Sequence, residues 1–570
     1  MKKSGVKNRV LSYEEMWKNL NTILAPEKSL YFAAIVYGIG ASVLSLAVPI
    51  SVQSLVNSVA FTGLLQPLLV LSFVLFSLLV FSGILNVVQF YVTELFQRHF
   101  FARSASDAAL ALLDANSHVV DQRDGLSLVN KYFDIMTVQK KVTSLIVGGV
   151  AIALQTFAGL LLLAFYHPYF LAFDILLLVL LVLVWGLFGK NGLKSATYES
   201  TSKYEVAEWL EQIAKSHSFF KTTLRRKKAL QVADEKIKGY LDNRQQHFKF
   251  LLYQIIFLFS IYALMSSAVL GLGGYLVILE QLSLGQLVAA ELVATMILGA
   301  LAKSGKHLED FYDLYAAVEK LTVFKKLPSE EVTRVDLHDE ACGLDFRKVE
   351  GSHWGVDYSF DFQLECGRKY FAGKDSFFLQ ALFVELVRKN LEPYKGRIYL
   401  GSTPTDDLGQ EEINDYVGVL DRIRIIEGSI WDNIAFGQDS SSISEMKNII
   451  DIVELNFLEE ELPKGLDTHL TASGSPLWSS QLILLELAKH LMKKPKVLIL
   501  TDIFDQIEVR LRNRILSRLL ELPMTLLVFS DKHKAPKDFD DYLWFGHEKV
   551  TISESMEEFK DYLLQKEKTS

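Results

Sequence analysis

Long stretches without charged side chains dominate the first half of the chain. From Ser29 to Thr93 no Asp, Glu, Lys or Arg occurs. Because one bilayer-crossing helix needs roughly 20 apolar residues, this stretch is long enough for two such helices and a short link. Four more apolar runs follow, at 142–166, 168–189, 250–279 and 284–302. The pattern therefore predicts six membrane-spanning helices.

The polar segments around these runs predict an orientation. The first residues, MKKSGVKNRV, are not followed by the apolar stretch of a signal peptide. The next segment, LSYEEMWKNLNTILAP, is typical of an amphipathic helix on the membrane surface. The short links on one side hold a single charge, Glu280, whereas the long loops on the other side carry most of the Lys and Arg. We therefore expect a multi-pass protein of the cell (inner) membrane with both termini in the cytoplasm.

The pattern changes after Ala302. A helical segment leaves the membrane and ends in the charged link KKLPSEEVTRVD, and short β-branched runs then alternate with helical stretches. RIYL, YVGVL, KVLIL and TLLVF are predicted to be buried parallel strands. The fold class is thus an α-helical membrane domain followed by a soluble α/β domain. Its predicted parts are 1–28 (cytoplasmic N-terminus and interfacial helix), 29–326 (membrane domain), 327–335 (linker) and 336–570 (soluble domain).

Two loops between the apolar runs are too long to be plain connectors. They cover 97–141 and 190–249 and have helical periodicity. At 1.5 Å per residue, half of each loop can reach about 30 Å beyond the membrane. We expect the membrane helices to continue through these loops and to need a soluble domain to dock on.

Net charge and cysteine content limit the partners and metal sites that the chain is expected to have. The net charge of −8 gives no argument for a nucleic-acid partner. The two cysteines, Cys342 and Cys366, have no partner at metal-ligand spacing. They are predicted to be free, reduced thiols, and no metal site is expected.

The whole chain resembles an ABC exporter half-transporter. In the membrane half, VPISVQSLVNSV, LVNKYFDIMTVQKK and KYEVAEWLEQIAK are similar to the haemolysin-type, or type I secretion, branch. In the soluble half, GRKY, EPYKGRIYLG, EGSIWDNIAFG and LPKGLDTHL stand in the order and spacing of an ABC nucleotide-binding domain. The resemblance implies an ATP-binding fold, a dimer, and coupling helices at the two loop tips.

The resemblance also locates the phosphate loop, in AGKDSFFLQALF. That loop uses glycines to curl backbone N–H groups round the phosphates, a Lys to pair with them and a hydroxyl to hold Mg²⁺. Here Phe377 and Leu379 occupy glycine positions, Gln380 replaces the Lys and Ala381 replaces the hydroxyl. Lys374 is the one residue that could partly substitute for the lost charge.

The metal-supporting and catalytic acids should follow the strand KVLIL. The chain has Thr501 and Asp502 there. If Asp502 is taken as the metal-supporting residue instead, Ile503 falls at the catalytic position. Neither register supplies an acidic pair.

The signature that reaches a partner's ATP is also altered, because LWSSQ stands where a Ser and two Gly residues precede a Gln. Trp478 replaces the hydroxyl, Ser479 and Ser480 replace the glycines, and Gln481 alone remains.

Two further switch positions depart from the family. The glutamine switch is replaced by Asp421 or Arg422, and the histidine switch by Asp531, with His533 in a loop two residues on. The adenine-stacking aromatic falls near His353, beside Trp354, which is equally suited to a core position.

Four residues in the membrane half are further candidates. By resemblance, the loop tips at 128–136 and 206–215 are coupling segments, with Met136 and Trp209 as contacts; ordinary solvated helices are the alternative. Asp174 and Glu291 lie inside apolar runs, where a carboxylate marks a substrate pathway or a packing role, unless it reaches the interface. The basic run 225–228 is interpreted as a solvated face.

Five ATP-site motifs are altered together, while the surrounding pattern is kept. We therefore predict a catalytically degenerate ABC-exporter-like subunit of a transport or secretion assembly, without ATP hydrolysis of its own. The alternatives are a non-transporting membrane scaffold or regulator, and an ATP-driven exporter of a polypeptide or small molecule. No cofactor is expected unless the degenerate site retains weak binding of ATP and Mg²⁺. The expected partners are the membrane, a second half-transporter in a homodimer or heterodimer, and a periplasmic adaptor protein.

Overall fold

The computed structural model describes residues 12–61, 65–115, 129–302, 304–325, 342–353, 355–437, 443–530 and 539–559. Contacts divide the chain into two compact units, 1–328 and 329–570. The predicted linker at 327–335 lies outside the described residues. Each unit is described by itself.

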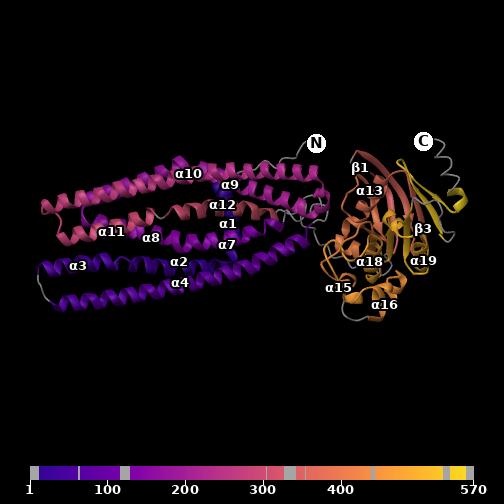
Figure 1. The fold of residues 1–570 in the computed structure, drawn as a ribbon, viewed down its shortest axis with the longest axis horizontal. Helices are drawn as coiled ribbons and strands as arrows, with labels where there is room; N and C mark the ends of the chain where they lie inside the picture. The colour runs from indigo at the N-terminus through magenta and orange to yellow at the C-terminus, as the bar shows by residue number, and fades with distance from the viewer. Residues whose placement is uncertain are drawn as a thin grey trace. The chain divides into compact units, whose positions relative to one another are not determined.

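The first unit is a bundle of long helices (Figure 1). Its helices are α1 (Tyr13–Leu24), α2 (Lys28–Leu44), α3 (Ala47–Phe61), α4 (Leu65–Leu113), α7 (Phe133–Ser144), α8 (Val150–Tyr166), α9 (Pro168–Lys215), α10 (Thr223–Ile278), α11 (Leu284–Ala302) and α12 (Gly305–Lys325). Among the described residues, 6 helical segments are long and apolar enough to cross a membrane. The predicted number of spanning helices is confirmed.

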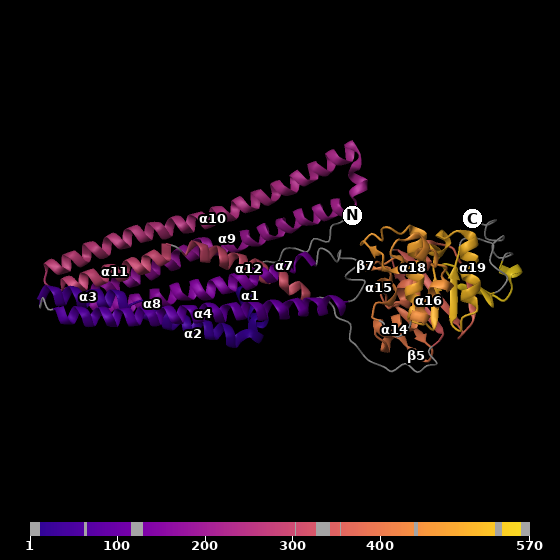
Figure 2. The same cartoon turned by 60° about the horizontal axis from the view of Figure 1, so that its bottom comes forward.

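The predicted helical extensions are present. α9 has 48 residues and α10 has 56. At 1.5 Å per residue these helices are roughly 70 and 85 Å long, more than twice the thickness of a bilayer core. Figure 2 shows their far ends diverging together from the other helices of this unit.

The segment before the first crossing is the predicted amphipathic helix, α1. Its N-terminus is closed by a capping box, in which Ser12 and Glu15 satisfy each other's backbone N–H. Met16 is buried at 0% exposure, whereas the next residue, Trp17, is 55% exposed. Glu27, at the end of this segment, accepts two hydrogen bonds from the Arg103 guanidinium of α4, at 2.6 and 2.9 Å. The helix is therefore fixed to the bundle by both packing and charge.

The second unit contains two main sheets. The larger has the strand order β12-β11-β3-β10-β9-β6 and the smaller has the order β2-β1-β4-β5. Its strands are β1 (Leu344–His353), β2 (Val356–Leu364), β3 (Lys369–Lys374), β4 (Lys395–Leu400), β5 (Thr403–Pro404), β6 (Val417–Leu420), β9 (Val497–Leu500), β10 (Thr525–Phe529), β11 (Asp541–Phe545) and β12 (Val550–Ser553). Its main helices are α13 (Phe377–Val387), α14 (Gln410–Tyr416), α15 (Ile430–Ala435), α16 (Ile443–Ile452), α18 (Ser479–Met492) and α19 (Val509–Leu520).

Three of the four predicted parallel strands are confirmed, and one prediction was wrong. β6, β9 and β10 lie side by side, parallel and fully buried. RIYL belongs to β4, which pairs antiparallel with β1 and β5. The first half of β4 is exposed because Lys395 and Arg397 project to solvent. Its short apolar end resembled a buried parallel strand because both are brief β-branched runs.

The prediction of free thiols was also wrong, because Cys342 and Cys366 form a disulfide. Strands β1 and β2 pair antiparallel with Leu344 opposite Leu364, so the residues two positions beyond each strand end meet. The Cα atoms of the two cysteines are 4.9 Å apart. The separation of the two cysteines along the chain did not indicate that they are close in space. Their proximity comes from the register of β1 and β2.

Candidate functional site

The turn between β3 and α13 is the place where a phosphate loop should lie. β3 ends at Lys374 and α13 begins at Phe377, so only two residues connect them. Ser376 caps the helix by accepting the Phe378 N–H at 3.1 Å. Leu379 is fully buried in the core, while Phe377 is 60% exposed. In this turn, the N–H groups of Asp375, Phe378 and Leu379 already donate to acceptors of the chain itself.

Behind this turn, three polar side chains bind one another. The Lys374 ammonium donates to Gln380 Oε1 at 2.7 Å and to Asp502 Oδ2 at 3.1 Å. The Gln380 amide donates to Asp502 Oδ1 at 3.0 Å. The Lys374 side chain is 6% exposed, so its ammonium group faces Asp502 and not solvent. We call these three residues the closed triad.

The residues at and after the end of β9 are also bonded to other residues of this unit. Thr501 is buried, and its hydroxyl donates to the Leu420 carbonyl of β6 at 2.7 Å. Asp505, a residue that the sequence did not single out, accepts the Ser530 hydroxyl at 2.8 Å and pairs with Arg512. Among the described residues no group of three His, Cys, Asp or Glu side chains could hold a metal ion.

Ala381, which stands for the metal-binding hydroxyl, is a half-buried residue of α13. The residues at the strand ends therefore do not fit a nucleotide triphosphate with Mg²⁺. The lysine is engaged, the acidic pair is absent at these positions, and three N–H groups of the turn are already bonded.

Asp421, at the position of the glutamine switch, is the centre of an ion network. The Arg388 guanidinium donates to both carboxylate oxygens of Asp421 at 2.8 Å, and Arg422 and Arg424 approach the same carboxylate at 3.1 and 3.3 Å. Burial alone would raise the pKa of Asp421, but Arg388 and its neighbours more than offset this effect and lower it. The carboxylate therefore stays charged and locked.

The network continues into α18, where Glu486 lies 3.9 Å from Arg424 and 2.9 Å from Lys489. His490 lies half-buried beside these groups, and desolvation lowers its pKa to about 3, with Arg388 and Arg424 adding to the effect. Sequence reasoning missed Arg388, Glu486 and His490. The only available signal was the spacing of Glu486 from Lys489 and His490 on one helix face.

The residue at the signature position, Trp478, faces solvent. Trp478 precedes α18 and is 78% exposed. Its backbone N–H donates to Gln481 Oε1 at 2.8 Å, so the one residue kept from the motif serves as a helix cap. Asp531, His533 and Trp354, and the side chain of His353, lie outside the described residues.

The predicted coupling residues lie in the extensions of the first unit. Met136 on α7 is 38% exposed. Trp209 on α9 donates its indole N–H to the Ala229 carbonyl of α10 at 3.1 Å and packs edge-on against Phe220. The groove that Trp209 fills is thus formed by its own hairpin. A coupling role for Met136 and Trp209 stays a prediction.

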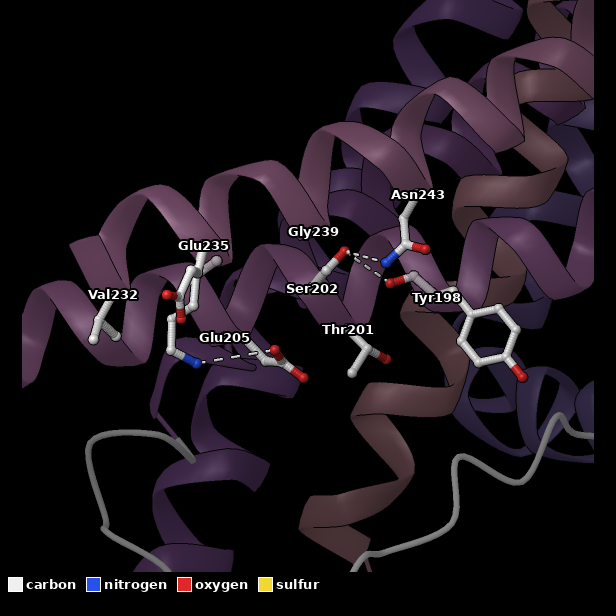
Figure 3. A pocket seen from close by; sticks show the side chains of 9 residues that line it. Tyr198, Thr201, Ser202, Glu205, Val232, Glu235, Gly239 and Asn243 are labelled. Atoms are coloured by element: carbon white, nitrogen blue, oxygen red, sulfur yellow. Dashed lines mark hydrogen bonds and ion pairs between the residues drawn. The ribbon is translucent and has the colours of Figure 1, made fainter. Parts of the chain in front are cut away.

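Between these two extensions lies a polar cleft of about 330 Å³ (Figure 3). Asn243 of α10 donates to the Ser202 hydroxyl of α9 at 3.2 Å, and Lys236 faces Glu205 at 3.9 Å. From the other side, Lys320 of α12 reaches the Thr201 hydroxyl at 3.1 Å. These contacts connect α9, α10 and α12 well beyond the apolar segments.

The two intramembrane carboxyl groups differ in their surroundings. Asp174 is 4% exposed, and neither of its oxygens has a hydrogen-bond partner among the described residues. Glu291 is half-buried and accepts the Thr295 hydroxyl at 3.4 Å through one oxygen.

No family model matches the chain. The uncharacterized ABC transporter ATP-binding protein YfiB of Bacillus subtilis is 26% identical over 183 residues, which is 31% of this chain and 32% of that protein. The lactococcin-A transport/processing ATP-binding protein of Lactococcus lactis is 22% identical over 274 residues, or 47% and 38% of the two chains. The matched segments thus span less than half of each relative's length.

A solved structure described as a bacterial Atm1-family ABC exporter with ATP bound superposes with a TM-score of 0.81. The superposition covers 93% of this chain and 96% of that one, at 16% sequence identity. At this identity the likeness concerns the fold. It extends over both units of the chain.

Proposed function

Because this chain is an ABC exporter half-transporter, with six membrane-spanning helices followed by a nucleotide-binding-type domain, we propose that it is a catalytically degenerate subunit of a transport or secretion assembly. In this role it contributes helices to the assembly and hydrolyses no ATP of its own.

The closed triad is the observation that carries this proposal. Phosphate-binding sites of this type need a cation directed at the ligand and an open loop of backbone N–H groups. Lys374 is instead held by Asp502 and Gln380, at 3.1 and 2.7 Å. To bind a phosphate, the chain would have to break this buried ion pair and move the first turn of α13. Both changes oppose binding.

The signature position supports a structural role rather than a shared ATPase. Trp478 offers an indole where close backbone approach to phosphate is required, and Gln481 is engaged as a helix cap. A partner with intact motifs would therefore gain little from this surface. We propose that the chain completes neither its own ATP site nor its neighbour's.

The membrane placement belongs to the same proposal. Lys and Arg gather in the two long extensions, and this distribution supports a placement of the extensions, both termini and the second unit in the cytoplasm. A second half-transporter, identical or different, is the proposed partner. A periplasmic adaptor is a further proposed component, by analogy with type I secretion.

The direct test is Mg-ATP binding and turnover by the purified full chain in lipid nanodiscs. We expect no saturable binding at millimolar ATP and no vanadate-sensitive phosphate release. The informative variant is Lys374→Ala, and the matched control is Lys395→Ala, which removes a surface lysine paired with Glu350. Micromolar binding that Lys374→Ala abolishes and Lys395→Ala preserves would refute the proposal.

An ATP-driven exporter is the competing function, because relatives such as the lactococcin-A protein carry transport in their names. The composition of the complex purified from native membranes, together with its ATPase activity, distinguishes these functions. A homodimer without ATPase activity favours the scaffold or regulator, and a mixed pair with activity favours a structural subunit. If the activity of a mixed pair is lost on Trp478→Ala, this chain does complete its partner's site.

A further inference from the structure

A break in helical geometry marks one region of the first unit. Between α7 and α8, residues Leu145–Gly149 form a π-helical turn, a rare distortion that is frequent at functional sites. Within it, Gly148 packs against the His307 ring of α12, and a Cβ atom on Gly148 would lie 2.2 Å from that ring. The distortion therefore brings α12 against the start of α8.

Beside this turn is a pocket of about 340 Å³, bounded by α8, α9 and α12. Its walls are almost entirely apolar and aromatic, and each lining residue is half-buried, as expected of a groove that is open on one side. The lining consists of Leu145, Gly149, Ile152, Trp185, Ser304, His307, Leu308 and Phe311. This volume lies within the range of small-molecule sites.

The aromatic wall of the pocket is held in place by the bundle. Trp185 stacks on Tyr312 with an interplanar angle of 8° and meets Phe311 edge-on at 5.8 Å. No hydrogen-bond acceptor for the Trp185 indole N–H is found in the part of the chain that the structure describes. A tryptophan with an apolar body and a free polar edge is typical of the membrane–water boundary.

The pocket lies at the level where apolar sequence gives way to charged sequence. The apolar run of α9 ends at Lys190, five residues after Trp185, and Lys306 precedes His307 on α12. Both lysines are exposed. Lys141, at the same level on α7, is instead engaged by Asp310 and Asp313, at 2.7 and 2.8 Å. Lys306, next to the lining residue His307, and Lys190 thus place two positive charges at the level of the apolar groove.

We propose that this pocket binds an anionic phospholipid of the adjoining leaflet. One acyl chain lies against Leu145, Ile152 and Phe311, and the phosphate faces Lys190 and Lys306 at the rim. The Trp185 indole N–H donates to an ester oxygen of the lipid. A groove with an apolar interior and a cationic edge at the bilayer boundary matches an anionic headgroup attached to an acyl chain.

The test uses the full chain in nanodiscs that contain a phospholipid with a photoreactive diazirine in its acyl chain. Phosphatidylglycerol and phosphatidylcholine are compared, and labelled peptides are mapped by mass spectrometry. We expect phosphatidylglycerol to label the segments 145–152 and 304–311 several-fold more than phosphatidylcholine. Replacing Lys306 or Lys190 by Gln lowers this labelling roughly fivefold for each lysine.

Gly149→Phe fills the pocket, because a Cβ atom on Gly149 meets only Leu145, at 3.6 Å. It abolishes the labelling, whereas the control Leu183→Phe, at a 53% exposed position on α9, does not. Ile152→Trp fills the pocket from another position if Gly149→Phe elutes as an aggregate. Equal labelling by both lipids, or labelling that survives in both pocket-filling variants, would overturn the proposal.

Discussion

The carboxyl groups at the strand ends of the second unit differ from the carboxyl group of Asp174 in the first unit. At the strand ends, the partly buried carboxylates are paired: Asp421 with Arg388, Asp502 with Lys374, and Asp505 with Arg512. In the first unit, Asp174 is buried without a hydrogen-bond partner among the described residues. The difference teaches that the charges at the strand ends are satisfied by side chains of the same unit, whereas the helix bundle, which pairs Glu27 and Asp310, leaves Asp174 without a hydrogen-bond partner among the described residues.

Under the proposed function, the closed triad would explain how the fold is kept after ATP chemistry is lost. The core strands β9 and β10 are almost completely buried and need only apolar packing. The polar strand ends do not contribute to that packing, so their residues can change without loss of the sheet. In a subunit that binds no phosphate, a carboxylate such as Asp502 would remove the cost of leaving the Lys374 cation unpaired.

The largest expected effect is that of Asp421→Ala. It leaves the Arg388 guanidinium, 11% exposed, with the Val419 carbonyl as its remaining acceptor in the network. We expect a loss of about 3 to 4 kcal/mol in local stability. Hydrogen exchange of the peptides that cover β6 and α13 measures it. Glu350→Ala, which breaks a surface pair with Lys395, should cost less than about 1 kcal/mol, and equal losses would contradict the importance of burial.

The next effect tests the closed triad. Asp502→Ala removes one partner of Lys374, and we expect a loss of about 2 kcal/mol, because Asp502 is 27% exposed and partly screened. Asp502→Asn keeps hydrogen-bonding capacity and should lose less. Exchange rates at the start of α13 report the change. If ATP binding appears in Asp502→Ala, the triad has blocked a site that remains competent.

We expect the stability of the second unit to depend on pH through His490. Its folded-state pKa, about 3, lies below the ordinary value of 6.5, so the unfolded chain binds the proton more tightly. Stability is therefore lost as the pH falls below about 6.5, by about 2 kcal/mol at pH ~5. Exchange protection of α18 across this range measures the loss. His490→Gln should remove most of the slope, whereas the exposed His469→Gln should not, and an unchanged slope in His490→Gln would refute the assignment.

The smallest effect has the opposite sign. Asp174→Leu replaces an unpaired buried carboxyl with an apolar side chain, and we expect a gain of about 1 kcal/mol. Thermal unfolding of the full chain in nanodiscs detects it. Glu291→Leu should gain less, because Glu291 already accepts the Thr295 hydroxyl. A fall in melting temperature for Asp174→Leu would mean that a partner or ligand satisfies this carboxyl.

Much of the candidate site could be located from the sequence, but its contacts could not. The positions of Gln380, Thr501 and Asp502 followed from their distance to recognisable strands. Lys374 contacts Asp502, which lies 128 positions further along the chain, and this contact depends on the tertiary structure. The same holds for Arg388 and Asp421, which a local pattern does not connect.

The sequence by itself determined the number of membrane helices, their long extensions, and most of the buried parallel strands. These features depend on runs and periods of apolar residues, which are local properties of the chain. Only the tertiary structure decided the cysteine pairing, the antiparallel place of β4, the closed triad and the isolation of Asp174. Each of these depends on which distant residues meet, and strand register and helix packing set those meetings.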